Sequence, residues 1–479
     1  MNTKVVMLAW TLMGLICGFT GVARSQDFNY IANPPYVAVS PTTVIPDGLP
    51  YCGTGSGLKL ICYGPSFIRK AYNFPSNLDG TGQTILIVDA YGSPTIETDL
   101  ALFDQVFNIP APPSFTIYCP QGCPNTSPNN KLHGPLGWSV ETSLDVEYAH
   151  AMAPGANIVL VVAASSTGDA INAAEAAAIT KYPGSIMSQS FGIGEFLIQG
   201  NQVQMMQAHR NYLAAQAAGI TVLASAGDFG AANAFGLGLK LIFGTIPNAS
   251  FPASDPLVTS VGGTQGDPYT DPGVTTLSCP ANTLCSAGLA TFTGPCTSAN
   301  GFRVSPCTPV GYGAEQVWNE PFFAPMSTGG GAPSLFFSAP SYQNGLNLSA
   351  RGTPDVSYNA AIHGGVLVAN STLIPGVSAF FIVGGTSAGS PQWAGIAALA
   401  NQLAGHSLGF LNPAIYRLAQ TSHYASDFHD ITIGNNQMPG TTPSESAGAG
   451  WDLASGWGTP NVANLLPDLV ACATTATCP

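Results

Sequence analysis

One stretch of the sequence places a serine where a nucleophile could work. Residues 384–391, GGTSAGSP, put Ser387 in a glycine-rich turn directly ahead of a helical pattern. Such a turn exposes the hydroxyl, and the following N–H groups and the helix N-terminus favour a developing negative charge. Ser387 is therefore a candidate nucleophile that needs a base. The same pattern also suits a serine that only caps the helix.

A second stretch could supply that base. Glu141 and Asp145 are four residues apart in a helical pattern, which places their Cβ atoms about 5–6 Å apart on one face. Two carboxylates at that distance repel each other, and sharing a proton raises one apparent pKa. This arrangement suits a general base and its orienting partner in the acidic range. The alternative is a solvated helix start, where acidic residues only favour the helix dipole.

A third stretch, ASAGDFG at residues 224–230, places Asp228 between glycines at the end of an apolar strand. A carboxylate at this position can simply cap a turn, since aspartate is a common turn residue. It can also face a ligand, because the sites of parallel sheets lie beyond the carboxyl ends of their strands.

The elements that must position these residues alternate along the chain. Short β-branched runs predict strands at residues 84–90, 157–164, 185–191, 221–226 and 257–261. Apolar spacing near 3.6 predicts helices at residues 95–107, 140–152, 170–181 and 203–218. Pro391, which suits the first turn of a helix, predicts a last one at 391–403. This rhythm predicts an α/β fold with a mostly parallel sheet covered on both faces.

Composition narrows the classes of function. The 479 residues include 12 Lys plus Arg against 25 Asp plus Glu, for a net charge of -13. We therefore expect no nucleic-acid partner. Hydrophobic residues make up 46%, enough for a large core, which excludes a disordered chain.

Charged residues make up only 8%, so few ion pairs would be lost in acid, and we infer acid tolerance. The alternative is merely a low-charge secreted composition.

The N-terminus and the cysteines both indicate export. An apolar run behind Lys4, followed by small residues, predicts a secretory signal over residues 1–25. A membrane anchor is the alternative, but the run is short for a span of about 20 residues.

Of 11 cysteines, Cys17 lies in this signal, leaving ten. We expect local disulfides among neighbours rather than a zinc site, because no Cys-x-x-Cys pair is present. The neighbours are Cys52 and Cys62, Cys119 and Cys123, Cys279 and Cys285, Cys296 and Cys307, and Cys472 and Cys478.

The predicted organisation is a single catalytic-sized domain at residues 67–470. A Pro-rich N-terminal segment at residues 26–66, wrapped or flexible, precedes it, and a tail at residues 471–479 follows. From residue 262 to about 312 the sequence turns rich in Gly, Pro, Ser and Thr and holds four cysteines. We interpret that region as a disulfide-stapled insertion with long loops.

Together, the three stretches resemble the sedolisin family of serine-carboxyl peptidases. The likeness runs from about residue 72 to 460 and includes GQTILIVDAYG at 82–92, AHAMAPGA at 149–156, FPAS at 251–254 and VGGT at 261–264. The resemblance implies a subtilisin-like three-layer α/β/α fold. It also implies a secreted endopeptidase that hydrolyses polypeptides at acidic pH. We expect a monomer without stable membrane association.

Position by position, the resemblance implies a role for each candidate. Ser387 would be the nucleophile, Glu141 its general base and Asp145 the carboxylate behind that base. Asp228 would be the oxyanion-hole acid, which can donate a hydrogen bond only while it is protonated. An aspartate ordinarily has a pKa of about 3.9, so activity should be confined to acid. The strand end expected to hold the substrate comprises Ser188, Gln189, Ser190 and Gly192.

A calcium site is also implied by the resemblance, near the carboxyl end of the chain. Its ligands would be side-chain oxygens of Asp430 and Asp452 and backbone carbonyls of Ile431, Gly448 and Gly450. Hard oxygen ligands of this kind suit one structural Ca²⁺. Without the resemblance, the same residues predict only a flexible turn, since the spacing is not that of an EF-hand.

Two rival hypotheses stay open, and the first arises from a departure from the family. Family members usually carry a large folding prosegment, whereas here residues 26–83 separate the signal from the first core strand. This favours an inactive binding or structural protein on the peptidase fold as one alternative. The other is a subtilisin-type triad of Asp89, His133 and Ser387. Asp228 argues against that triad, because it stands where such enzymes use a neutral amide.

Overall fold

A twisted parallel sheet forms the centre of the computed structural model, which describes residues 28–32, 34–39, 52–54, 56, 59–124, 135–198, 202–233, 245–267, 278–294, 296–297, 308–321, 327–373, 379–475 and 478–479. The sheet has eight strands in the order β18-β12-β10-β8-β5-β7-β6, and β23 also pairs with β12. Only β18 is antiparallel to its neighbour. The strands are β5 Thr84–Ala90, β6 Phe115–Tyr118, β7 Asn157–Ala163, β8 Ile186–Gln189, β10 Thr221–Ser225, β12 Thr259–Gly266, β18 Glu315–Val317 and β23 Val356–Asn359.

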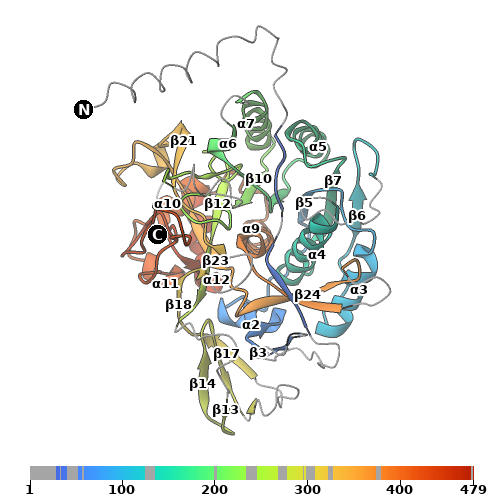
Figure 1. Cartoon of the computed structure of the whole chain (residues 1–479), viewed down its shortest axis with the longest axis vertical. Helices are drawn as coiled ribbons and strands as arrows, with labels where there is room; N and C mark the ends of the chain where they lie inside the picture. Colours follow the sequence, from blue (N-terminus) through green and yellow to red (C-terminus); the bar gives the residue numbers. More distant parts are fainter. Residues whose placement is uncertain are drawn as a thin grey trace, which may run out of the picture.

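Helices cover both faces of this sheet, so the predicted three-layer α/β/α class is confirmed (Figure 1). One face of β5 contributes Ile85 and Ile87 to a core shared with the helices α4 (Pro135–Met152) and α9 (Gly389–Ala404). Leu86 and Val88 on the other face join a second core under α5 (Gly168–Lys181) and α7 (Gln202–Ala217). Successive side chains of a strand point to opposite faces, which is why a fully buried strand is apolar throughout. The main helices are α3 Ile96–Phe107, α4 Pro135–Met152, α5 Gly168–Lys181, α7 Gln202–Ala217, α9 Gly389–Ala404 and α12 Val462–Thr474.

A smaller sheet packs beside α4 and carries the chain into the serine turn. It has the order β1-β25-β24-β4, with bounds β1 Tyr36–Ala38, β4 Cys62–Tyr63, β24 Gly365–Asn370 and β25 Ala379–Val383. The described parts of the Pro-rich N-terminal segment therefore wrap onto the domain through β1 and β4.

The disulfide-stapled region projects at the bottom of Figure 1 as short antiparallel strands. They are β13 Ser278–Cys279, β14 Leu284–Ala287, β15 Ala290–Thr293, β16 Cys296–Thr297 and β17 Thr308–Tyr312. Four of the expected local disulfides are confirmed: Cys52–Cys62, Cys119–Cys123, Cys279–Cys285 and Cys472–Cys478. The fifth expected pair includes Cys307, which lies outside the described residues, as does the predicted signal at residues 1–25.

The remaining elements are short and connect these layers. They are α2 Pro65–Ala71, α6 Glu195–Ile198, α10 Asn412–Leu418, α11 Tyr424–Asp427, η1 Ser341–Gln343, η2 Thr386–Ala388, β2 Cys52–Gly53, β3 Lys59–Leu60, β9 Ile193–Gly194, β11 Ser250–Phe251, β19 Asn319–Glu320, β20 Ser327–Thr328, β21 Pro333–Ser338, β22 Ala350–Gly352, β26 Phe428–His429 and β27 Thr459–Pro460. Among the described helices, none combines the length and the apolar character that crossing a membrane requires.

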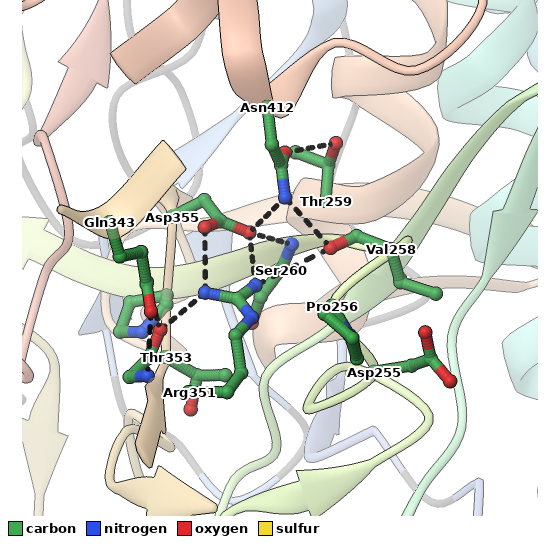
Figure 2. Close-up of polar contacts among 12 residues, drawn as sticks. Asp255, Pro256, Val258, Thr259, Ser260, Gln343, Arg351, Thr353, Asp355 and Asn412 are labelled. Carbon is green, nitrogen blue, oxygen red and sulfur yellow. Dashed lines mark hydrogen bonds and ion pairs between the residues drawn. The ribbon is translucent and has the colours of Figure 1, made fainter. Parts of the chain in front are cut away.

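A buried ion pair ties the start of β12 to the strands around it (Figure 2). Arg351 donates from its two terminal nitrogens to Asp355, at 2.8 and 2.5 Å, and both side chains are fully buried. Asp355 also accepts from the backbone N–H of Ser260 at 2.8 Å, from Tyr416 at 2.7 Å and from Asn412 at 3.1 Å. This network fixes the positions of β12 and β23, since Ser260 lies in β12 and Asp355 directly precedes β23.

Candidate active site

The serine turn joins β25 to α9 and brings Ser387 to the carboxyl edge of the large sheet. Gly385 has φ +99°, and a Cβ there would lie 2.7 Å from Asp228 Oδ2. Only glycine therefore allows the Asp228 carboxyl to approach this turn. Ser387 is 6% exposed, and its hydroxyl donates to the carbonyl oxygen of Ser190 at 3.4 Å.

Asp228 is held against the serine turn by Thr386. The backbone N–H and the hydroxyl of Thr386 both donate to Asp228 Oδ1, each at 2.8 Å. Burial of the carboxyl raises the pKa of Asp228 to about 6, although the two bonds from Thr386 act in the opposite direction. The carboxyl is therefore neutral in acid, and Oδ2 is the oxygen left to carry the proton.

Glu141 and Asp145 lie on α4 behind the serine and are completely buried. Burial raises the pKa of Glu141 well above its ordinary value, and the charges of Asp145 and Asp89 add to the rise. The Ser387 hydroxyl lies near enough to Glu141 to lower that pKa in part. Neither carboxyl accepts a hydrogen bond of ordinary geometry from the described residues, so no such bond offsets the effect of burial, which favours the protonated form.

Sequence reasoning missed the role of Asp89 as a third carboxyl group of this cluster. Asp89 stands at the end of β5, is fully buried, and has its pKa raised by burial to about 7. Its charge also raises the pKa of Asp145, after the larger effect of burial. The signal was an aspartate at the end of an apolar strand, which the sequence suggested only as part of the alternative triad with His133 and Ser387. His133 lies outside the described residues.

The cleft in front of the serine is lined by Ser387, Asp228, Thr386, Ser190 and Gly192 among others. Ser190 donates from its hydroxyl to the carbonyl oxygen of Ser387 at 3.3 Å. Of the four residues expected to hold the substrate, Ser190 and Gly192 line this cleft. The other two point into the core.

Ser188 and Gln189 have partners of their own there. The Ser188 hydroxyl lies 2.9 Å from that of Ser390, and the Tyr212 hydroxyl donates to Gln189 Oε1 at 3.0 Å. Both belong to β8, which is buried on both faces of the sheet. Only beyond the strand end can side chains face a ligand.

The expected calcium ligands lie together in one loop. Asp430 accepts from the Tyr424 hydroxyl at 2.9 Å and from the Gly450 N–H at 3.0 Å. Asp452 accepts from the Gly448 N–H at 2.8 Å. After burial, the charges of both carboxylates raise the pKa of Tyr424, so both lie within electrostatic range of that hydroxyl. Among the described residues no cationic side chain pairs with either, and this oxygen-rich, negative loop fits a hard cation.

A separate cluster of possible metal ligands lies between α11 and α12. His423, Asp427 and Asp468 offer one ligand atom each, and these atoms lie within 4.8 Å of one another. His423 Nδ1 lies 2.6 Å from Asp468 Oδ2, so the pair forms a hydrogen-bonded ion pair when the histidine is protonated. None of these residues was expected as a ligand.

The fold and the site define a class: a subtilisin-like α/β protein in which a serine ahead of a helix lies beside buried carboxyl groups. The family model described as the subtilase family matches residues 128–458. The chain therefore belongs to the subtilase family, and its relatives place it in the sedolisin family, as the motifs indicated.

The curated relatives include kumamolisin from Bacillus sp. (strain MN-32), which is 34% identical over 427 residues that cover 86% of this chain and 65% of kumamolisin. Sedolisin from Pseudomonas sp. (strain 101) is 31% identical over 53% of this chain and 36% of its own length. Human tripeptidyl-peptidase 1 is 28% identical over 85% of this chain and 64% of its own length. The chain thus spans about two thirds of kumamolisin and of tripeptidyl-peptidase 1.

A solved structure shows the same fold. Pseudomonas sedolisin, a serine-carboxyl proteinase complexed with two molecules of pseudo-iodotyrostatin, superposes with a TM-score of 0.64 at 24% identity. The match covers 85% of this chain and 98% of that one.

Proposed function

We propose that this protein is an extracytoplasmic serine-carboxyl endopeptidase that hydrolyses polypeptides at acidic pH. The observation that carries the proposal is that Ser387 and Asp228 line one cleft, with Glu141 buried behind the serine near its hydroxyl and a pKa of about 6 for Asp228. The disulfides support a location in an oxidising compartment, and the family's serine-carboxyl peptidases support the reaction class.

In the proposed first step, Ser387 Oγ attacks the carbonyl carbon of the peptide bond and its proton passes to Glu141. The C–O bond forms while the carbonyl π pair moves onto oxygen. Asp145 and Asp89 orient Glu141 and share the protons of the cluster. A neutral Asp228 donates a hydrogen bond to the new oxyanion, which an ionised carboxylate would repel.

In the following steps, the proton on Glu141 passes to the leaving amine as the C–N bond breaks. An acyl ester on Ser387 remains. Water then attacks the ester carbonyl carbon while Glu141 accepts a proton from the water, and the C–O bond to Ser387 breaks as Glu141 returns that proton to Ser387 Oγ, which releases the carboxylic acid product. The requirement for a neutral Asp228 limits the reaction to pH values below its pKa of about 6. Ser190 and Gly192 at the end of β8 would hold the substrate backbone.

We also propose one structural Ca²⁺ held by side-chain oxygens of Asp430 and Asp452 and the carbonyl oxygens of Ile431, Gly448 and Gly450. The support is the pair of neighbouring carboxylates without a cationic partner among the described residues. A bound ion would neutralise these charges and stabilise the loop that follows β26.

The test is a profile of hydrolysis rate against pH from 3 to 8, with unfolded polypeptide and with N-terminally blocked peptides as substrates. We expect cleavage of both substrates, with the rate declining as pH rises through about 6, and no cleavage by Ser387→Ala. Cleavage that requires a free N-terminus would contradict endopeptidase action. A neutral optimum that is lost in His133→Ala would instead support the Asp89, His133 and Ser387 triad.

A further inference from the structure

A cluster of three side chains joins the short helix α11 to the C-terminal helix α12. His423 directly precedes α11, Asp427 ends it, and Asp468 lies in α12. One possible ligand atom from each lies within 4.8 Å of the other two. The two helices pack against one another in the red, carboxyl-terminal part of Figure 1. None of these three residues lines the serine cleft, so the proposed peptidase reaction does not use them.

Asp427 is the member of the cluster that lacks a partner. Its side chain is completely buried. Oδ1 accepts a hydrogen bond from the Ser426 hydroxyl at 3.0 Å, whereas Oδ2 is buried without a hydrogen-bond partner among the described residues. A buried polar atom without a partner lowers stability, and the loss is larger for a charged group. A bound cation would supply the partner that this oxygen lacks.

The charges of the cluster do not balance. His423 Nδ1 lies 2.6 Å from Asp468 Oδ2, and their side chains are 42% and 19% exposed. Even a protonated His423 brings one positive charge to two carboxylates. In the part of the chain that the structure describes, no other cationic side chain forms an ion pair with either carboxylate. The cluster is therefore negative, and its two partly exposed members leave it open to an ion from solvent.

Backbone hydrogen bonds hold the three residues together without a metal. The Asp427 N–H donates to the His423 carbonyl at 3.1 Å, and the Asn461 N–H at the start of α12 donates to the Asp427 carbonyl at 2.8 Å. The ligand atoms of a tetrahedral zinc ion lie about 3–3.5 Å apart, given bonds of about 2.0–2.1 Å. Shifts of about 1 Å in the side chains alone would bring the three atoms to that spacing.

We propose that His423 Nδ1 and one carboxylate oxygen each of Asp427 and Asp468 bind a Zn²⁺ ion that fastens α11 to α12, with water as the fourth ligand. The metal replaces any proton that His423 shares with Asp468. An imidazole ligand suits zinc, whereas Ca²⁺ prefers a set of oxygens such as the proposed loop of Asp430 and Asp452. The inference goes beyond the proposed function and does not rest on it.

The first experiment titrates ZnCl₂ into the full chain at pH 7.5 by isothermal titration calorimetry. The protein is stripped with EDTA and then kept in excess Ca²⁺, which fills the loop of Asp430 and Asp452. We expect one Zn²⁺ per chain in the parent and at least tenfold weaker binding in His423→Gln. The matched control is His406→Gln, at an exposed histidine whose ring contacts the Ala404 carbonyl, and it should bind like the parent. Equal affinity in the parent and His423→Gln, or no binding by the parent, would overturn the proposal.

Thermal melts distinguish a metal site from a plain ion pair between His423 and Asp468. We expect Zn²⁺ at about 100 times its Kd to raise the Tm of the calcium-saturated parent by a few degrees. Asp468→Asn should lose this response, and Asp169→Asn, at an exposed position on α5, should keep it. An ion pair alone predicts a Tm that is the same with and without Zn²⁺ in all three proteins, and that result would refute the site.

A third measurement needs no variant and so cannot fail through misfolding. Crystals of the parent protein are soaked in ZnCl₂, and diffraction is recorded on both sides of the zinc absorption edge. We expect an anomalous peak about 2.0–2.1 Å from His423 Nδ1, between the carboxylates of Asp427 and Asp468. A map with no peak there, at a Zn²⁺ concentration that saturates the calorimetric titration, would show that zinc binds elsewhere and would contradict the assignment.

Discussion

At the scale of single residues, the proposed chemistry depends on carboxyl groups that hold protons above their ordinary pH range. Burial is the main cause for Asp228, Glu141, Asp145 and Asp89 alike. Removal from water disfavours the charged form of a carboxyl. The serine site can therefore contain an acid and a base of the same chemical type, distinguished only by their surroundings.

Replacement of Asp228 tests whether its proton is used. We expect Asp228→Ala to lower kcat about 10²- to 10³-fold, the usual loss for one oxyanion donor. Asp228→Asn restores a donor that does not titrate, so its rate should decline less steeply than that of the parent as pH rises through about 6. The measurement is kcat against pH for the three proteins. If the Asp228→Asn profile keeps the steep decline, another group must cause that decline.

At the scale of elements, positioning depends on contacts between segments far apart in the chain. The end of β10 supplies Asp228, the turn after β25 supplies Ser387 and α4 supplies Glu141. The buried network of Arg351 and Asp355 fixes β12 and β23, which lie next to β10 in the same sheet.

Loss of Arg351 should be costly because it leaves the buried Asp355 carboxylate without its cation. We expect Arg351→Leu to lower the free energy of unfolding by about 3–5 kcal/mol. The matched control is Arg210→Leu on the exposed side of α7, where a change within about 0.5 kcal/mol is expected. Urea unfolding of the two variants measures both effects. Similar midpoints for them would argue that the network contributes little.

At the scale of the whole molecule, the buried carboxyls couple stability to pH. Burial raises the pKa to about 6 in Asp228, about 7 in Asp89 and about 8 in Glu175. Between their ordinary values, 3.8 for Asp and 4.5 for Glu, and these raised values, the unfolded chain binds fewer protons than the folded one. The free energy of unfolding then falls as pH rises.

We therefore expect the Tm to be highest near pH 4 and to decrease toward pH 8. Most of this contribution is present below the unfolded pKa values and is lost as pH passes the folded ones, from about 6 to about 8. Thermal melts at constant ionic strength and constant calcium concentration measure it. A Tm that rises steadily from pH 4 to pH 7 would show that these carboxyls are already ionised in the folded protein.

Calcium removal tests the loop after β26. We expect a chelator to lower the Tm at neutral pH, since a ligand present at 100 times its Kd contributes about 2.7 kcal/mol. Asp430→Asn should lower the Tm in calcium and lose most of the response to chelator. Asp169→Asn, at an exposed position on α5, should keep the full response. If chelator leaves the Tm of the parent protein unchanged, that result would contradict the proposed calcium site.

The sequence by itself determined the layers and named the residues that we propose to carry the chemistry. Buried parallel strands are apolar along their whole length, so β5 was predicted with its observed bounds. The α4 helix was predicted from its periodicity, and α9 from Pro391 at its first turn. Ser387, Glu141, Asp145 and Asp228 could be named because each stands in a short motif.

Only the tertiary structure decided how these residues share their environment. No local pattern shows that Asp89 joins the carboxyl cluster, because its burial depends on α4 packing over β5. Nor could Asp468 be grouped with His423 and Asp427, since these residues meet only where α12 packs against α11. Proton affinity depends on which surfaces exclude water, and that is settled only when the chain has folded.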